Sequence, residues 1–245
     1  MHIVITGASK RVGFGLAESF IHDGHYVSMH VRSQPSNFQE FCRLHENQTH
    51  VIVEDLLHEH ALNSLYARLT ERFGPADLLI NNVSNFEPDR ATDFSHDMLQ
   101  AHMRVNLETA ITLSRDMYRD NTRGDASIIN ITDQRVSRLN PNFFTYTLAK
   151  SSLWTATITM AQEFAPNIRV NAIGPGPTLM NKRQNNEDFE KQIAALPLKQ
   201  MVSVQDIYRT ACFLAQSSCI TGQLIHVDSG QHLAWQTPDV VGINE

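Results

Sequence analysis

The first 21 residues, MHIVITGASKRVGFGLAESFI (1–21), decide the fold. Residues 2–6 are apolar and mostly β-branched, which predicts a strand, and the strand passes directly into a turn containing Gly7 and Gly13. An apolar stripe in residues 16–21 then predicts a helix. Glycines in such a unit let the backbone approach a pyrophosphate at the positive end of the helix. The unit predicts a dinucleotide site, although Arg11 stands where a glycine is usual and a purely structural turn is the alternative.

Strand and helix patterns alternate along the rest of the chain. Apolar runs predict strands at 25–31, 50–55, 77–82, 126–132, 168–173 and 222–227, and helical patterns cover roughly 59–73, 97–118 and 144–164. This alternation implies right-handed crossovers and a parallel sheet covered on both faces. We therefore expect an α/β fold, a single doubly wound Rossmann-type domain over 1–245 with about seven parallel strands.

Residues 176–202 interrupt the alternation. They follow a predicted strand. Their first two residues are the second Gly-Pro pair of Gly-Pro-Gly-Pro (174–177), and a polar run follows at 181–186. Ligands bind outside the carboxyl ends of the strands in such folds, so this segment is expected to be a substrate lid. A disordered surface loop is an equal alternative.

Composition excludes several classes of function. The 245 residues carry a formal net charge of -6, with no basic excess for nucleic acid and no polybasic tract for a membrane surface. The first strand leaves no room for a signal peptide, and no apolar run approaches the roughly 20 residues of a membrane span. We expect a soluble, cytoplasmic protein.

Metal and disulfide chemistry are also not expected. The three cysteines form no C-x-x-C motif, so free buried cysteines are the better interpretation. The densest histidine cluster, His58-Glu59-His60, lacks metal-ligand spacing, because side chains two apart lie on different sides of a helix. We predict no metal site.

Tyr146 and Lys150 are four residues apart in a predicted helix and so share one face. A positive charge within about 4–6 Å favours the phenolate, so we expect the pKa of Tyr146 to move towards neutrality. Such a tyrosine can act as general acid or base. Alone, however, Y-x-x-x-K is a weak signal, and a solvated helix face is its first interpretation.

Taken together, these residues resemble the short-chain dehydrogenase/reductase family over essentially the whole chain. The order and spacing of the family are matched by Thr6-Gly7 through Gly13, Asp55, Asn81-Asn82, Asn106, Tyr146 with Lys150, Asn171 through Gly176, Thr178 and 221–228. The resemblance implies NAD(P)H binding, with Tyr146 exchanging the proton and Lys150 holding the nicotinamide ribose. It also implies that Asn106 anchors a proton-relay water, Asp55 meets the adenine and Thr178 meets the carboxamide or phosphate side of the cofactor.

The expected cofactor is NADPH. A carboxylate usually ends the second strand of an NAD-selective domain, whereas here the strand leads into Arg32 and Ser33, which suit a 2′-phosphate. The full set of expected cofactor residues is Gly7, Ser9, Lys10, Arg11, Val12, Gly13, Arg32, Ser33, Asp55, Leu56, Asn82, Ser84, Lys150, Pro175, Gly176 and Thr178.

Departures from the family pattern resemble its pteridine reductase branch, which includes dihydromonapterin and alternative dihydrofolate reductases. Asp133 replaces the usual serine after the fifth strand, the fourth strand leads into Asn82-Val83-Ser84-Asn85-Phe86, and Arg11 replaces the turn glycine. The resemblance implies that the substrate is a pterin. Its expected binding residues are Arg11, Ser84, Phe86, Asp133 and Tyr146, and the expected catalytic residues are Asp133, Tyr146, Lys150 and Asn106.

The chemistry is consistent with these substitutions. A flat heteroaromatic ring stacks on an arene such as Phe86, and reducing its C=N bond requires a proton at nitrogen, which Asp133 with Tyr146 could relay. Structural alternatives are that Phe86 only packs a loop and that Asp133 only caps the next segment. Rival functions are a reductase of 3-oxoacyl thioesters or small ketones and a non-catalytic NADP-binding protein.

The resemblance further implies a homotetramer in which helices 97–118 and 144–164 pair between subunits. The tail after Asp228, with His232, Leu233 and Trp235, either reaches a neighbouring subunit's pocket or packs on its own domain.

Overall fold

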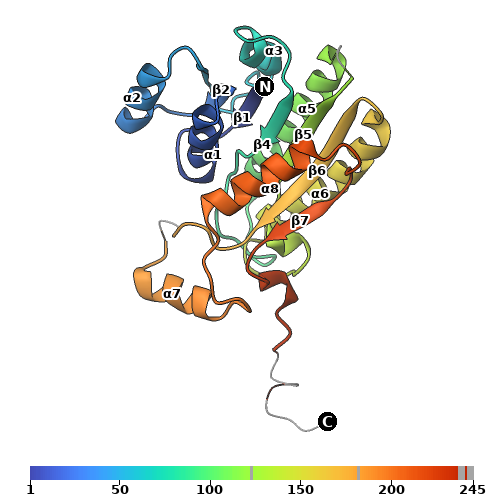
Figure 1. Ribbon diagram of the computed structural model, residues 1–245. Coiled ribbons are helices and arrows are strands. Elements are labelled where there is room, and N and C mark those ends of the chain that lie inside the picture. The colour runs from blue at the N-terminus through green and yellow to red at the C-terminus, as the bar shows by residue number, and fades with distance from the viewer. Residues whose placement is uncertain (122–123, 181–182, 237–240, 242–245) are drawn as a thin grey trace.

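A computed structural model of the chain describes residues 1–121, 124–180, 183–236 and 241. Its centre is a seven-stranded sheet in the order β3-β2-β1-β4-β5-β6-β7, and every neighbouring pair is parallel (Figure 1). The strands are β1 (His2–Thr6), β2 (Tyr26–Val31), β3 (Thr49–Val53), β4 (Leu78–Asn81), β5 (Ala126–Ile131), β6 (Ile168–Pro175) and β7 (Leu224–Val227). The expected doubly wound α/β fold is confirmed.

Helices cover both faces of the sheet. One apolar cluster joins one face to α1 (Arg11–His22), α2 (Ser36–Leu44) and α8 (Val204–Gln216). A second joins the opposite face to α3 (Leu65–Thr70), α5 (Thr109–Asp120) and α6 (Phe144–Phe164). Because both faces are covered, the central strands are buried throughout and are apolar runs rather than alternating patterns.

The predicted elements agree with the structure with three differences. The helix expected at 97–118 is α4 (His96–Met103) and α5 joined by a π-helical turn, η1 (Arg104–Glu108). The helix expected at 59–73 was too long, and only α3 within it is helical. Backbone carbonyls of Leu56, His58 and Glu59 accept hydrogen bonds from the Arg104 guanidinium at 2.7–2.8 Å, so this stretch turns instead. The sequence analysis did not identify α2 and α8.

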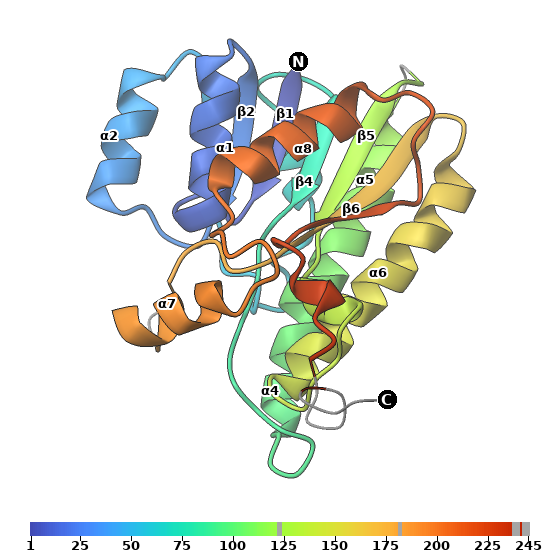
Figure 2. The same ribbon diagram turned by 60° about the horizontal axis from the view of Figure 1, so that its bottom comes forward.

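The segment 176–202 contains a helix, α7 (Asn186–Ala194), whose first turn is capped by the Asn185 side chain. Figures 1 and 2 show α7 apart from the sheet, beyond the end of β6. Residues 181 and 182 of the expected lid lie outside the described residues. The described part is therefore ordered chain with a helix, and its role as a lid stays a prediction.

All three cysteines are free, as expected, but none is fully buried: Cys42 and Cys212 are half-buried and Cys219 is exposed. The expectation of buried cysteines was therefore wrong: Cys42 and Cys212 lie at the margin of the core, and Cys219 lies on the surface. No helix among the described residues is long and apolar enough to cross a membrane.

Candidate active site

The turn after β1 is pressed against the end of β4. Gly7 has φ 69°, and a Cβ there would lie 2.8 Å from the Cα of Val83, while a Cβ on Gly13 would lie 2.4 Å from the Gly7 carbonyl oxygen. The Asn82 side chain donates to the carbonyls of Thr6 (2.8 Å) and Gly7 (3.2 Å). Glycine is thus required at both positions, and the turn keeps the N-terminus of α1 open to a ligand.

Arg11 occupies the glycine position of this turn in a left-handed conformation, with φ 56°. This conformation costs a residue with a side chain about 1–2 kcal/mol. Its guanidinium donates to the carbonyls of Met180 (2.9 Å) and Leu179 (2.8 Å). Arg11 therefore ties the expected cofactor turn to the segment 176–202, a contact that sequence reasoning missed because 168 residues separate the partners.

The remaining expected cofactor residues lie after the carboxyl ends of several strands, which meet at one edge of the sheet. Lys10, Arg32 and Ser33 are exposed, whereas Ser9 and Leu56 are buried. Asp55 accepts a hydrogen bond from the backbone of Leu57 (3.1 Å). Val12, beside the turn, is half-buried, and Pro175, Gly176 and Thr178 lie at or just after the end of β6. A Cβ on Gly176 would lie 2.7 Å from the Cα of Asp228, so this position is closely packed.

Tyr146 and Asp133 meet at the centre of the site. Tyr146 lies in the first turn of α6, and its hydroxyl donates to Asp133 Oδ2 at 2.9 Å. The other oxygen of Asp133 accepts from the backbone N–H of Arg135 (2.8 Å) and caps the 3-10 helix η2 (Gln134–Val136). The capping interpretation of Asp133 is therefore confirmed, and the cap holds its carboxylate against the phenol, whereas its role in protonation stays a prediction.

The expected pKa of Tyr146 was wrong in direction. Burial raises the pKa of Tyr146 well above its ordinary value, and the adjacent Asp133 charge raises it further, while Arg135 and the Ser84 hydroxyl lower it. Lys150 Nζ lies 5.9 Å from the centre of the phenol ring and donates to the Ile131 carbonyl at 2.6 Å. The nearby carboxylate outweighs the more distant ammonium, so Tyr146 holds its proton.

Burial also acts on Lys150. It lowers the pKa of this lysine to about 8, although the negative charge of Asp133 opposes the change. Lys150 is thus a buried amine whose charge is costly and whose side chain is fixed on the end of β5.

Phe86 packs against Tyr146, with ring centres 4.7 Å apart and planes at 72°. Its ring also stacks on Phe143, with centres 4.2 Å apart and planes at 5°. A planar ligand can therefore use only the opposite face of Phe86 unless Phe143 moves. Sequence reasoning missed Phe143, which has φ 57° and directly precedes α6. The adjacent aromatic residues Phe143 and Phe144 at the start of a predicted helix could have indicated it as a site residue.

Asn106 lies in the π-helical turn and is 1% exposed. Its side chain accepts from the backbone N–H of Asn85 (2.8 Å) and donates to the Asn85 carbonyl (2.9 Å). Asn106 therefore fixes the backbone between Ser84 and Phe86. Its role as anchor of a relay water stays a prediction.

A buried chain of hydrogen bonds, also missed from sequence, joins α4 to the start of α6. The Glu87 N–H donates to His102 Nε2 (3.3 Å), so Nδ1 carries the proton and donates to Thr145 Oγ1 (2.7 Å). Thr145 in turn donates to Asp89, and burial lowers the pKa of His102. The neutral imidazole thus fastens the Phe86 segment to the turn that carries Tyr146.

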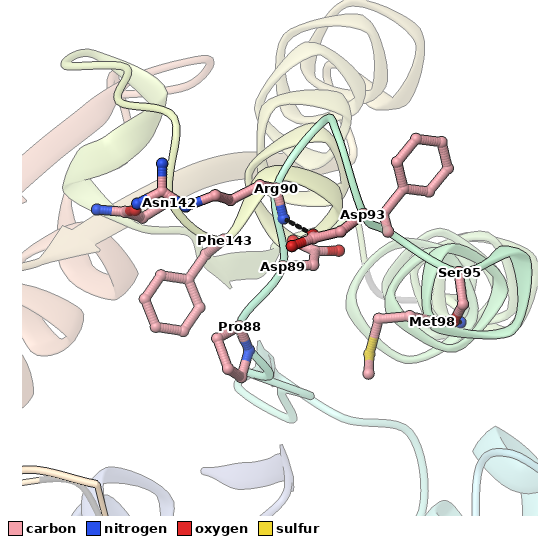
Figure 3. Close-up of a pocket in the computed structure, with 9 residues that line it drawn as sticks. Pro88, Asp89, Arg90, Asp93, Ser95, Met98, Asn142 and Phe143 are labelled. Carbon is pink, nitrogen blue, oxygen red and sulfur yellow. Dashed lines mark hydrogen bonds between the residues drawn. The ribbon is translucent and has the colours of Figure 1, made fainter.

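A groove of about 490 Å³ lies beyond Phe143 and contains none of the expected catalytic residues (Figure 3). It is lined by Pro88, Asp89, Arg90, Asp93, Phe94, Ser95, Met98, Asn142 and Phe143. Asp89 and Asp93 in its wall accept backbone hydrogen bonds. Two of its lining residues also contact the Tyr146 centre: Phe143 stacks on Phe86, and Asp89 accepts from Thr145.

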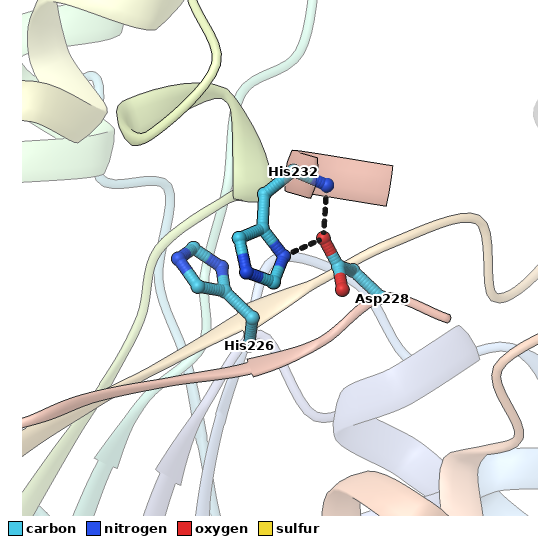
Figure 4. Close-up of side chains that lie close together, drawn as sticks. All are labelled: His226, Asp228 and His232. Atoms are coloured by element: carbon cyan, nitrogen blue, oxygen red, sulfur yellow. Dashed lines mark hydrogen bonds and ion pairs between the residues drawn. The ribbon is translucent and has the colours of Figure 1, made fainter. Parts of the chain in front are cut away.

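One group among the described residues has metal-ligand types in proximity: His226, Asp228 and His232 (Figure 4). The carboxylate of Asp228 accepts from the backbone N–H groups of Gly230 (3.0 Å) and His232 (2.8 Å) and from His232 Nδ1 (2.8 Å). The two rings stack with centres 3.9 Å apart, and nearly parallel stacked rings do not direct both lone pairs at one ion. The contacts form a clamp on the C-terminal turn, in which His232 packs on its own domain while Leu233 and Trp235 are exposed.

Known proteins resemble the chain over nearly its whole length. The family model described as enoyl-(acyl carrier protein) reductase matches residues 7–232. An oxidoreductase of Mycobacterium tuberculosis, MT0954, is 29% identical and aligns with 93% of the chain and 90% of its own length. The 3-oxoacyl-[acyl-carrier-protein] reductase FabG of Vibrio cholerae is 25% identical, covering 94% and 96%.

Solved structures are similar as well. FolM alternative dihydrofolate reductase 1 from Brucella canis, complexed with NADP, is 38% identical with a TM-score of 0.93, covering 98% of this chain and 97% of the other. The Brucella suis protein of that name, also with NADP, is 38% identical with a TM-score of 0.93 and covers 98% of each chain. With the sheet order and the Tyr146–Lys150 pair, these matches show that the chain is an oxidoreductase of the short-chain dehydrogenase/reductase family.

Proposed function

We propose that the protein uses NADPH to reduce a pterin substrate of the dihydropterin, dihydromonapterin or dihydrofolate type. The observation that carries the proposal is the 2.9 Å hydrogen bond from Tyr146 to Asp133 beside the Phe86 ring. It combines a protonated hydroxyl, a carboxylate and an aromatic surface. A flat nitrogen heterocycle is the substrate that requires all three.

The cofactor assignment rests on the turn after β1 and on the end of β2. Both Brucella structures contain NADP, and at 38% identity their cofactor sites are the nearest guide among the matches described above. Arg32 and Ser33 follow β2 with exposed side chains, available for a 2′-phosphate. Substituting Arg32→Ala should therefore weaken NADPH binding more than NADH binding.

When bound, the dihydronicotinamide supplies a hydride to a ring carbon. This chain's residues supply the proton that the adjacent ring nitrogen requires. Burial and Asp133 keep Tyr146 protonated before the reaction, and Asp133 orients its hydroxyl. The proton passes from the Tyr146 hydroxyl to the ring nitrogen as the hydride reaches the adjacent carbon, and a proton from water then restores the phenol. The buried Lys150 is held by its hydrogen bond to the carbonyl of Ile131, the last residue of β5.

A ketone reductase is the second candidate, supported by the match to 3-oxoacyl-[acyl-carrier-protein] reductase. A carbonyl oxygen gains negative charge as it is reduced, and a carboxylate 2.9 Å from the donor hydroxyl opposes this charge. Asp133 therefore favours a ring nitrogen. A purely NADP-binding protein would not require a proton donor, so the Tyr146–Asp133 pair favours an enzyme.

The test is to mix the purified protein with NADPH and, separately, dihydrobiopterin, dihydromonapterin, dihydrofolate and a β-keto thioester, and to follow the loss of NADPH absorbance. Oxidation with the pterins supports the proposal. Oxidation only with the thioester would contradict it, and no oxidation with any substrate, despite NADPH binding, would favour the binding protein.

We also propose that the protein assembles as a homotetramer through α5 and α6. Exposed apolar side chains on these helices support pairing, among them Leu148 and Ile158 on α6 and Tyr118 on α5. Light scattering with Leu148→Glu should show a smaller particle than the unchanged protein. Cytoplasmic location stays a prediction.

A further inference from the structure

We infer that Arg104 is a positioning residue for the adenosine half of the cofactor, because its side chain fastens the loop of residues 55–59 at the carboxyl end of β3. Arg104 acts through this loop and does not touch the cofactor. The inference rests on the cofactor part of the proposed function and does not depend on which substrate is reduced. The sequence analysis did not select Arg104.

The loop of residues 55–59 lies on the side of the sheet edge that receives the adenosine. In a doubly wound fold the pyrophosphate lies at the turn after the first strand, and the adenosine ribose lies at the end of the second. Here β3 is the next strand beyond β2, and the Glu54 N–H donates to the Val31 carbonyl at 2.9 Å, which joins the ends of the two strands. The loop that follows Glu54 therefore borders the adenosine beyond Arg32.

The guanidinium of Arg104 binds three backbone carbonyls of this loop. Its Nε donates to the carbonyl of Leu56 at 2.8 Å, and its Nη2 donates to those of His58 and Glu59, each at 2.7 Å. Hydrogen bonds from an ionised donor are stronger than neutral ones. The remaining nitrogen, Nη1, donates to Glu108 at 3.4 Å, so every nitrogen of the group has an acceptor within the protein. Arg104 is thus engaged by the chain itself rather than by a phosphate of the cofactor.

Arg104 connects the loop to another element. Within the loop, Asp55 Oδ1 accepts from the N–H of Leu57 (3.1 Å), and the Asp55 carbonyl accepts from the N–H of His58 (3.0 Å). These two bonds join neighbouring residues and close a local turn. The bonds from Arg104 span 45–48 residues and fix the position of that turn relative to the rest of the domain.

Arg104 is itself held by the π-helical turn η1, which it begins. Its carbonyl accepts from the backbone N–H of Thr109 and from the Thr109 hydroxyl (3.0 Å), and Thr109 is fully buried. Residues two apart lie on different sides of a helix, and Asn106 fixes Asn85 on its own side. Such π-helical turns are frequent at functional sites. One side chain of η1 therefore fastens the adenosine loop, and another fastens the segment that carries Phe86.

Loss of Arg104 should act on the part of the cofactor that NADPH and NADH share. The loop would then adopt several conformations, and the apparent affinity of a ligand falls with the fraction of molecules in the binding-competent one. The adenosine is common to both cofactors, whereas the 2′-phosphate is not. Removing Arg104 should therefore weaken both cofactors to the same extent. Removing Arg32, whose exposed side chain follows β2, should weaken NADPH more.

The experiment measures dissociation constants of NADP⁺, NAD⁺ and adenosine 2′,5′-bisphosphate by titration calorimetry. For Arg104→Met we expect all three constants to rise at least tenfold, with the ratio between NADP⁺ and NAD⁺ unchanged within twofold. Arg32→Ala should raise the constants of NADP⁺ and the bisphosphate but leave that of NAD⁺ within twofold. With a substrate that is turned over, Arg104→Met should raise KM for NADPH at least fivefold and change kcat less than twofold.

Arg169→Met is the matched control. The guanidinium of Arg169 also donates to three backbone carbonyls, at 2.6–3.0 Å, and these belong to Leu214, Ala215 and Ser217. It lies at the start of β6, at the edge of the sheet opposite the carboxyl ends of the strands. Arg169→Met should lower stability and leave all three dissociation constants unchanged.

Unchanged constants for NADP⁺ and NAD⁺ in Arg104→Met would overturn the inference, as would equal losses in Arg169→Met. A loss confined to NADP⁺ would make Arg104 a phosphate ligand, and a loss that spares the bisphosphate would place the effect outside the adenosine half; either would also overturn it. Should Arg104→Met not fold, Arg104→Lys decides the same comparison. It keeps the charge but lacks the planar fork, so at least a threefold loss for both cofactors is expected and no loss would refute the role.

These dissociation constants involve no pterin, so the two proposals can fail separately. Absence of pterin reduction together with the expected cofactor losses would refute the proposed reaction and leave the role of Arg104 supported. Pterin reduction by an Arg104→Met protein with unchanged cofactor affinity would support the reaction and refute the role of Arg104.

Discussion

The hydrogen bond between Tyr146 and Asp133 provides a direct test of the proposed protonation step. If Asp133 acts only through the Tyr146 hydroxyl, the effects of Tyr146→Phe and Asp133→Asn on the rate should not be additive in free energy. Removing a general acid typically costs about 10²–10⁴ in rate. A hydrogen bond to a charged group contributes about 1.5–3 kcal/mol, which corresponds to about 10- to 150-fold at about 1.4 kcal/mol per factor of ten. If Tyr146→Phe and Asp133→Asn acted independently, their losses would multiply to about 10³–10⁶.

We expect instead that the double variant loses no more than about twofold beyond Tyr146→Phe alone, because the aspartate acts through the hydroxyl it orients 2.9 Å away. The assay is single-turnover oxidation of NADPH with a saturating dihydropterin, with NADPH affinity measured separately by fluorescence. Losses that multiply in the double variant would refute the coupling.

A matched control is available far from the site. Tyr208 is as buried as Tyr146, at 6% against 5% exposed, and its hydroxyl donates to Asp23 at 2.5 Å between α8 and α1. Tyr208→Phe removes the same kind of bond and should lower stability while leaving the rate unchanged. A loss of rate in Tyr208→Phe would show that the Tyr146 effect reflects general destabilisation.

Three further predictions concern single positions. Gly13→Ala should abolish cofactor binding and lower the unfolding free energy by about 2–4 kcal/mol, because the new Cβ would lie 2.4 Å from the Gly7 carbonyl oxygen. An unchanged NADPH affinity, measured by titration, would contradict this prediction. Lys150 has a pKa of about 8 in the folded protein and about 10.4 in the unfolded chain, so the unfolded chain binds its proton more readily. The free energy of unfolding should therefore rise by about 3 kcal/mol as the pH increases from about 8 to about 10.4. Denaturant unfolding of Lys150→Met should show a smaller rise over the same range. The lowered pKa of His102 means that the unfolded chain takes up the proton more readily, so stability should fall as the pH drops below about 6.5. Burial lowers the pKa of other histidines as well, among them His2 and His30, so His102→Leu should weaken that dependence rather than remove it. The same variant should raise KM for the pterin more than it lowers kcat; an unchanged KM would show that the Glu87 segment needs no such support.

The fold followed from local pattern to a large degree. Buried parallel strands are continuous apolar runs, and the bounds predicted for α6 agree with the structure. The long helix expected at 97–118 was found, but not its π-helical turn, which depends on where Asn106 bonds. The helix expected at 59–73 failed because Arg104, over 40 residues away, attracts the carbonyls that a helix would have used.

The residues of the candidate site also fall into those that local sequence predicted and those that it did not. Residues adjacent in sequence, such as the glycine turn and the Tyr146–Lys150 spacing, were found from the chain itself. Phe143, Arg104 and His102 were not, because each acquires its role from a partner on another segment. No periodicity or spacing encodes such contacts.

The sequence by itself determined the order of the seven strands, the glycine turn and which side chains of α6 share a helix face, because these depend on backbone geometry over a few residues. Only the tertiary structure decided the protonation of Tyr146 and the fastening of Arg11 to Leu179 and Met180. A pKa is set by every charge and every solvent-excluding atom around a group, and a hydrogen bond by the position of its partner. Both quantities exist only after folding has brought distant segments together.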